Sequence, residues 1–315
     1  MKKILITGSS GFIAKELIEL LIQKDDLELY LLYRTKNSAV KKIKNCINLY
    51  CDICDKESLN LTLGKIDFDY VIHLAAQSNN LTADKSSRET LETNTQGTLN
   101  LLQECSNKTI KGFIFASSAI VYAFKERTPL KESYELEGKN IYAISKISSE
   151  SIAKYFSKSY QIPLIICRFG MVYGGGDTNM TRLVPYIMNC LISNEEIDIR
   201  SSKDIVLDPI YITDVGKGLM KLLEHFDKQE KVQEVFNLSS GKPIKMGDFV
   251  GKILATSGIK GIIPQYGDSG ATTQLLSIDR FERKIGKLKG YEMEEALKET
   301  LSWYRKNGIV NSRDL

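Results

Sequence analysis

KKILITGSSGFIAKELIELL, residues 2–21, places an apolar run and a helical pattern on either side of a very short connection. The run that ends at Ile6 is short, unbroken and rich in isoleucine, which is typical of a strand buried on both faces. Gly8 and Gly11 permit a sharp turn and a close approach to a ligand, and the helix behind them begins with unpaired N–H groups. The stretch therefore predicts a strand, a phosphate-binding turn and a helix, unless it is an ordinary connection that happens to use glycine.

The rest of the first half of the chain supports the first interpretation. Further apolar runs are separated by longer segments with helical spacing, such as 89–104 and 142–160. Strands and helices that alternate at this spacing predict an α/β fold with a doubly wound parallel sheet of the Rossmann type. Such sheets bind ligands at the carboxyl ends of their strands, where the opening turn lies. The apolar runs are Leu29–Leu32, Ile47–Tyr50, Tyr70–Leu74, Gly112–Ala116 and Leu164–Cys167.

The pattern changes after Arg168, where the glycine-rich stretch GMVYGGGDTNM and shorter elements follow. We therefore expect a sheet domain over 1–168 and a smaller C-terminal substrate lobe over 169–315. Within that lobe, the segment DPIYITDVGKGLMKLLEHF predicts a strand and a helix that return to the first domain, which assigns 206–232 to it.

Composition excludes several classes of protein. The 315 residues carry 43 basic and 39 acidic side chains, without the long basic block that a nucleic-acid surface would need. No apolar stretch approaches the ~20 residues that span a bilayer, so we expect a cytoplasmic protein without membrane contact. The only histidines are His73 and His225, which disfavours a Ser–His–acid hydrolase.

The cysteines do not indicate a metal site. Most of them lie in or beside apolar runs, where a reduced thiol acts as a small hydrophobe. Cys51 and Cys54 have the spacing of half a zinc site, but neither a second pair nor a nearby histidine completes it, and we expect no metal. The six cysteines are Cys46, Cys51, Cys54, Cys105, Cys167 and Cys190.

A candidate catalytic group follows the fifth predicted strand. Tyr142 and Lys146 are four residues apart and share one face of a predicted helix, while Ser117 and Ser118 end the strand FIFASS. A neighbouring ammonium favours the phenolate form of tyrosine, which brings it into range for proton transfer. A half-buried tyrosine beside a solvated lysine is the structural alternative.

Taken together, the motifs identify a family. The chain resembles extended short-chain dehydrogenases/reductases of the NAD-dependent epimerase/dehydratase type along nearly its whole length, and the order and spacing of the motifs carry the resemblance. These motifs are TGSSGFIA, YCDICD, VIHLAAQS, TNTQGTLN, FASSAIVY, YAISK, RFGMVYG, LDPIYITDV and EVFNLSSGKPI.

The resemblance implies roles for individual residues. Ser118, Tyr142 and Lys146 would form the catalytic group, with Lys146 also bound to the nicotinamide ribose. Ala14 takes the place of the family's third glycine, a small change that binding should tolerate. The other residues expected to contact the dinucleotide are Gly8, Ser10, Gly11, Phe12, Ile13, Asp52, Ile53, Leu74, Ala75, Ala76 and Phe169.

Some positions depart from the pattern of sugar-nucleotide enzymes. Leu207 stands where an arginine usually anchors the diphosphate, Pro209 replaces an aromatic residue, and Met171 replaces an asparagine. The stretch YGDSGATTQLLSID, residues 266–279, lacks the other arginine that often serves the same diphosphate. A sugar nucleotide stays the first choice of substrate, and a different hydroxy or keto compound is the alternative. Residues that would compensate for the missing arginines are Arg182, Arg200 and Lys203.

The residues after Ser118 narrow the reaction. Ring dehydratases of the family carry acidic residues there, whereas this chain has Ala119 and Ile120. We therefore expect an epimerase or a ketoreductase. A dinucleotide-sensing binding protein that has kept the fold without catalysis is the competing hypothesis.

The cofactor and the assembly complete the predictions. The second predicted strand ends in Tyr33 and Arg34 without the acidic residue that usually selects NAD, so Arg34 favours NADP over NAD. NAD held beside a solvated basic loop is the alternative. The resemblance also implies a homodimer through the helices of 89–104 and 142–160.

Overall fold

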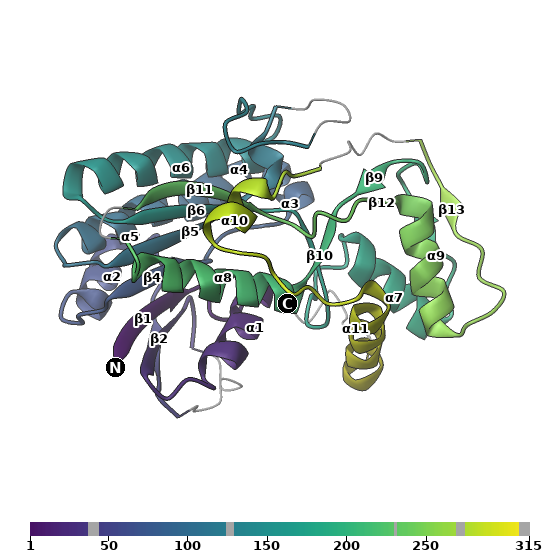
Figure 1. Cartoon of the computed structure of the whole chain (residues 1–315), viewed down its shortest axis with the longest axis horizontal. Coiled ribbons are helices and arrows are strands. Elements are labelled where there is room, and N and C mark those ends of the chain that lie inside the picture. Colours follow the sequence, from purple (N-terminus) through teal and green to yellow (C-terminus); the bar gives the residue numbers. More distant parts are fainter. Residues whose placement is uncertain (37–43, 124–128, 230–231, 269–274, 309–315) are drawn as a thin grey trace.

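A computed structural model describes residues 1–36, 44–123, 129–229, 232–268 and 275–308. Its centre is a sheet of seven parallel strands in the order β11-β6-β5-β4-β1-β2-β3 (Figure 1). The chain winds outward in both directions from β1, so the predicted doubly wound sheet is confirmed. The strands are β1 (Lys2–Thr7), β2 (Leu27–Tyr33), β3 (Cys46–Tyr50), β4 (Tyr70–His73), β5 (Gly112–Ser118), β6 (Leu164–Phe169) and β11 (Gln233–Leu238).

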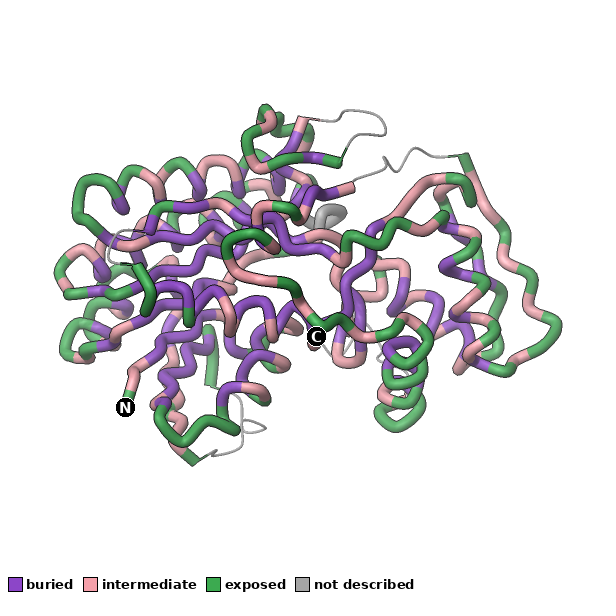
Figure 2. Tube along the Cα trace, viewed as in Figure 1, coloured by how far each residue is buried: buried purple, intermediate pink, exposed green. Residues whose placement is uncertain are grey.

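Both faces of the sheet are covered by helices, because alternate strand residues are apolar on both sides. Ile4 and Ile6 of β1 face a core shared with α1 and α8, whereas Leu5 between them faces a core shared with α2, α5 and α6. Figure 2 shows most of the strands as a buried layer between helices that alternate between buried and exposed residues, whereas β3 at the edge of the sheet is only partly covered. The helices are α1 (Phe12–Leu21), α2 (Lys56–Leu63), α5 (Gly97–Ser106), α6 (Ile141–Tyr160) and α8 (Ile212–Phe226).

A π-helical turn interrupts the helix predicted over 89–104. α3 (Asn80–Lys85) and α4 (Ser87–Leu91) precede the π segment Glu92–Gln96, and α5 continues directly from it. The wider turn brings Asn94 into the protein interior, where it is 1% exposed. Such π turns are often found at functional sites.

The C-terminal lobe lies beside the carboxyl ends of the strands and has a core of its own (Figure 1). Three helices and three small two-stranded sheets surround that core, and α10 (Asp279–Lys284) packs instead against the large sheet through Phe281. The elements of the lobe are β7 (Met171–Tyr173), α7 (Leu183–Ser193), β8 (Asp198–Ile199), β9 (Val206–Leu207), β10 (Pro209–Tyr211), β12 (Ile244–Lys245), α9 (Met246–Ser257), β13 (Gln265–Tyr266) and α11 (Met293–Asn307).

The chain passes between the two parts at other points than the sequence suggested. The strand expected in 208–211 forms as β10, but it pairs with β7 and not with the large sheet. The helix after it, α8, does return and packs against α1. β11, which lies beyond the segment assigned to the first domain, supplies the seventh strand beside β6. In the part of the chain that the structure describes, no helix is long and apolar enough to cross a membrane.

Candidate active site

The turn between β1 and α1 has the geometry that the opening motif predicts. Gly8 has a φ of +68°, and a Cβ added to it would lie 2.7 Å from the backbone of Ala75. The Gly11 N–H donates to the Gly8 carbonyl over 2.8 Å, and α1 begins at Phe12 with no side-chain cap. The N–H groups of the first turn of α1 are therefore free to bind an anion.

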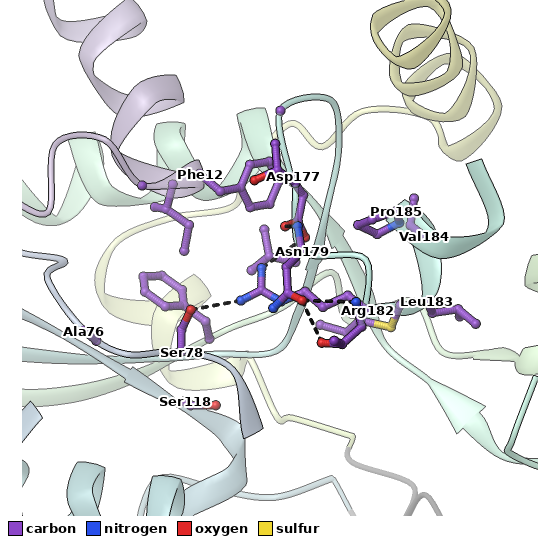
Figure 3. Close-up of a pocket in the computed structure, with 18 of the residues that line it drawn as sticks. Phe12, Ala76, Ser78, Ser118, Asp177, Asn179, Arg182, Leu183, Val184 and Pro185 are labelled. Atoms are coloured by element: carbon purple, nitrogen blue, oxygen red, sulfur yellow. Dashed lines mark hydrogen bonds and ion pairs between the residues drawn. The ribbon is translucent and has the colours of Figure 1, made fainter. Parts of the chain in front are cut away.

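A cavity of about 1070 Å³ extends from this turn to the C-terminal lobe. The carboxyl ends of β1, β4, β5 and β6 form one wall, and the segment between β7 and α7 faces them (Figure 3). Most of the residues predicted to bind cofactor or substrate line it. They are Gly8, Ser10, Gly11, Phe12, Ile13, Leu74, Ala75, Ala76, Ser118, Tyr142, Lys146 and Phe169.

Three predicted cofactor residues are not among those that line the cavity. Arg34 follows β2 as an exposed residue. The Asp52 Oδ1 accepts a hydrogen bond from the Cys54 N–H over 2.9 Å. Ile53 is 6% exposed, and a Cβ on Gly97 would lie 2.6 Å from its side chain, so it packs against the start of α5.

Tyr142 and Ser118 meet at the floor of the cavity. Asn140 caps α6 by accepting a hydrogen bond from the Ala143 N–H over 2.8 Å, and Tyr142 lies in the first turn behind this cap. Burial raises the pKa of the Tyr142 phenol, although the positive charge of Arg182 and a hydrogen bond with Ser118 act in the opposite direction. The sequence argument expected the phenolate to be favoured by a neighbouring ammonium and by an oxidised nicotinamide. In the protein alone, burial outweighs the effects of Arg182 and Ser118, and the pKa is raised.

Lys146 is buried beside Tyr142. Its Nζ donates to the carbonyl of Ala116 over 2.9 Å and lies 6.0 Å from the centre of the Tyr142 ring. Burial lowers the pKa of this ammonium to about 8, while the carboxylate of Glu150 raises it. Lys146 therefore stays predominantly charged at neutral pH and is able to release a proton at a pH not far above it.

A polar network that sequence reasoning missed supports the floor. His73, at the end of β4, contacts the hydroxyls of Thr7 and Thr98 at 2.7 and 2.9 Å, and burial lowers its pKa to about 3. His73 is therefore neutral and positions β4 between β1 and α5. Asn94 clamps the loop after β4 by donating to the Gln77 carbonyl and accepting from the Gln77 N–H.

The opposite wall carries a charged group. The Arg182 Nη1 lies 3.0 Å from Asp177, and its Nη2 donates to the Ser78 hydroxyl over 3.2 Å, which links the lobe to the loop after β4 (Figure 3). Arg200 also lines the cavity, whereas Lys203 is not among the lining residues. Leu207, in place of the usual arginine, packs against the core of the lobe.

The described residues offer no group of three or more His, Cys, Asp or Glu side chains that could hold a metal ion. The cysteines are free, and Cys51 and Cys54 lie beside α5 away from the cavity lining. Burial raises the pKa of the Cys54 thiol to about 11, which makes it a poor metal ligand at neutral pH.

Known proteins resemble this chain over most of its length. The model of the NAD dependent epimerase/dehydratase family matches residues 4–239. UDP-glucose 4-epimerase of Pisum sativum is 25% identical, over 97% of this chain and 96% of its own length. The dTDP-D-glucose 4,6-dehydratase of Homo sapiens is 23% identical, over 97% of this chain and 91% of its own.

A solved structure shows the same fold. UDP-glucuronic acid 4-epimerase of Bacillus cereus, in complex with UDP-glucuronic acid and NAD, superposes with a TM-score of 0.87 at 20% identity, over 97% of this chain and 100% of that one. The chain therefore belongs to the NAD-dependent epimerase/dehydratase family, a group of enzymes among the extended short-chain dehydrogenases/reductases.

Proposed function

We propose that this enzyme moves hydride to and from a hydroxyl-bearing carbon of a sugar nucleotide, as a 4-epimerase or a 4-ketoreductase. The observation that carries the proposal is the group of Ser118 and the buried Tyr142 and Lys146, at the floor of a cavity that begins at the β1–α1 turn. This juxtaposition places an acid/base beside the binding region expected for a dinucleotide.

The residues present fit a dinucleotide. Gly8 leaves a space that a Cβ would fill, and the free N–H groups of α1 suit a pyrophosphate. Gly11, Phe12 and Ile13 would hold that end, and Lys146 and Phe169 the nicotinamide end. The bound nicotinamide would supply the hydride acceptor or donor.

The three side chains at the floor of the cavity each have a separate role in the proton transfer that accompanies hydride transfer. The Tyr142 oxygen takes the proton of the reacting hydroxyl, or returns it to the carbonyl. Ser118 hydrogen-bonds the same substrate oxygen and orients it toward Tyr142. Lys146, whose ammonium lies 6.0 Å from the centre of the Tyr142 ring, would favour the phenolate that this transfer requires. Arg182 and Ser118 also lower the pKa of Tyr142, against the effect of burial.

The charges around the floor argue against dehydration. Among the described residues that line the cavity, the carboxylates are Asp177 and Asp198, and Asp177 is paired with Arg182. Ala119, directly after Ser118, is 4% exposed. Elimination of water from a sugar ring needs a further acid and base at the reacting carbons, and this floor has no carboxylate to supply them.

Arg182 is our candidate anchor for the substrate diphosphate. It precedes α7, whose N-terminus lines the cavity through Leu183 and Val184 and has no side-chain cap. A guanidinium and a helix N-terminus together form a site for phosphate oxygens. Arg182 would then exchange its contact with Ser78 for the ligand, and this anchor replaces the arginine that Leu207 removes.

The proposal is tested with a panel of UDP- and dTDP-hexoses and their 4-keto forms, each with NAD and with NADP, by mass spectrometry of the products. We expect epimerised or reduced sugar nucleotides. Simple hydroxy and keto compounds in the same panel test the alternative of a non-nucleotide substrate. Dinucleotide binding with no product from any compound would overturn the proposal in favour of a sensor.

We further propose that two copies of the chain associate through α4 and α6, which pack side by side. Ile144 and Tyr155 on α6 are 40% and 64% exposed, and Leu91 on α4 is 36% exposed. Exposed apolar side chains on adjacent helices suit a four-helix interface. Solution scattering at micromolar concentration should give the mass of a dimer, and a monomer mass would contradict it.

A further inference from the structure

Glu150 is a third polar residue on the face of α6 that carries the catalytic group. It follows Tyr142 and Lys146 at intervals of one helical turn, so the three side chains lie in a row. Its side chain is 0% exposed. A buried carboxylate is costly unless it is paired and hydrogen-bonded, so its partners indicate its role.

Both oxygens of this carboxylate are held from the sheet. The Arg168 Nε and Nη2 donate to Glu150 Oε1 and Oε2 over 2.9 and 2.7 Å, and the Ser117 hydroxyl donates to Oε1 over 2.6 Å. Ser117 and Arg168 are direct neighbours across β5 and β6. Glu150 therefore fastens α6 to the ends of two strands, one residue before Ser118.

Arg168 is fixed from its other side. Its Nη1 donates to the Glu132 carbonyl over 3.2 Å, and its guanidinium lies 4.7 Å from the centre of the Tyr122 ring. The Tyr122 hydroxyl in turn donates to Asn237 over 2.6 Å. Glu150 and Arg168 do not line the cavity, whereas Ser117, which is bound to Glu150, does. The ion pair therefore influences chemistry through the residues that it holds in place.

The charge of Glu150 acts on Lys146. The Lys146 ammonium faces Tyr142 and Glu150 on its own helix, neutral His73 from β4, and the Phe115 ring of β5 at 5.1 Å. Among these groups Glu150 carries the negative charge. Burial opposes the ammonium form, and the carboxylate offsets part of that cost.

We propose that Glu150 is a positioning residue, which holds the strand end with Ser118 against the helix with Tyr142 and supplies the negative charge that balances the buried ammonium of Lys146. Its effect on turnover rests on the proposed function. Its effect on Lys146 does not, because that effect is a property of the protein alone.

The first experiment measures Lys146 directly. Protein labelled with ¹³C at lysine Cε is titrated by NMR, and the Lys146 signal is assigned by its loss in Lys146→Met. In Glu150→Gln, which keeps the shape of the side chain, we expect the midpoint to fall by about one pH unit. Lys154→Gln is the matched control, because Lys154 also pairs with Glu150 but is 42% exposed. An unchanged midpoint in folded Glu150→Gln would overturn the charge role.

A second variant separates charge from folding. Glu150→Gln leaves Arg168 buried without a counter-charge, so Glu150→Gln with Arg168→Gln restores a neutral pair. We expect the double variant to regain thermal stability while Lys146 keeps its lowered midpoint. Recovery of the parent midpoint in the double variant would overturn the charge role of Glu150, because it would assign the lowered midpoint of Glu150→Gln to the unpaired Arg168 guanidinium.

Kinetics test the positioning role. Once the panel has identified a substrate, Ser117→Ala should lower kcat about tenfold and leave KM within about twofold, because it loosens Ser118 but keeps the charge. The Lys146 midpoint should not change in this variant. A kcat equal to that of the parent would overturn the positioning role. If the panel yields no substrate, the proposed function fails, and the titration still decides the role of Glu150 in holding the charge of Lys146.

Discussion

The two ends of the cavity are lined by different kinds of chemical group. The end at β1 and β4 presents mainly backbone and uncharged residues, such as Gly8, Gly11 and Ala75, with Lys15 as a charged side chain. The end at the lobe carries Asp177, Arg182 and Arg200. Backbone groups recognise what all dinucleotides share, and charged side chains recognise what distinguishes one substrate from another. Under the proposed function, the cofactor class would be set by a continuous motif, and the substrate by residues that the lobe brings together.

The variant with the largest expected effect removes the proposed acid/base and leaves both ends of the cavity intact. Tyr142→Phe should lower kcat by about 10²–10⁴-fold, the usual worth of a general acid/base. Dinucleotide affinity should change little, because the phenol is only one part of the binding surface. Stopped-flow turnover and calorimetric titration measure the two effects, and turnover near that of the parent would rule out the acid/base role.

The next variant disrupts the cofactor end, which is the end of the cavity at β1 and β4 where we propose that the dinucleotide binds. Gly8→Ala should lower dinucleotide affinity by at least about tenfold, since a positive φ costs an alanine roughly 1–2 kcal/mol and the new Cβ meets the backbone of Ala75. Gly258→Ala is a matched control, because Gly258 has a φ of +69° with nothing within 4 Å of its Cβ position. The control should lose stability only. Equal dinucleotide affinity in both variants would contradict a role for the Gly8 turn in binding the dinucleotide.

The third variant disrupts the end of the cavity at the C-terminal lobe, where we propose that the sugar nucleotide binds. Arg182→Gln should raise the KM for a sugar nucleotide about ten- to hundredfold, because a charge-assisted hydrogen bond is worth about 1.5–3 kcal/mol. Dinucleotide affinity should not change. The pKa of Tyr142 should rise further, since a positive charge that lowers it is lost, and the acid limb of the kcat profile then moves to higher pH. Lys203→Gln, outside the cavity lining, should leave KM unchanged, and an unchanged KM in Arg182→Gln would refute the anchor.

The same contrast explains what the sequence could predict. Strands β1 to β6 each contain a largely apolar run, and each run was evident in the sequence. Strand β11 was not evident, because Glu234 and Asn237 interrupt it. Their partners are distant: Lys284 pairs with Glu234 Oε1, and the carbonyls of Leu130 and Ser277 accept from Asn237. Pairing between segments far apart in the chain cannot be inferred from local pattern.

Some residues of the candidate site could be predicted from the sequence and others could not. The motif residues of the β1–α1 turn and the floor line the cavity as expected, because local turns and helix spacing place them. Asn94 and Glu150 went unnoticed, since their roles depend on partners in the loop after β4 and in β6. One part of the sequence, residues 269–274 within the stretch that lacks the second arginine, lies outside the described residues.

The smallest expected effect concerns Arg34, at the border of the cofactor end. Its guanidinium could pair with a 2′-phosphate, so Arg34 is the candidate position at which this end would distinguish NADP from NAD. Arg34 is exposed and outside the cavity lining, and an exposed ion pair contributes little. We therefore expect Arg34→Ala to weaken NADP binding about three- to tenfold and to leave NAD binding unchanged. Arg283→Ala, at another exposed arginine, should change neither affinity. Calorimetric titration with each dinucleotide measures the difference. If the variant binds NADP as tightly as the parent does, Arg34 is only a surface charge and the cofactor end recognises nothing beyond the shared dinucleotide.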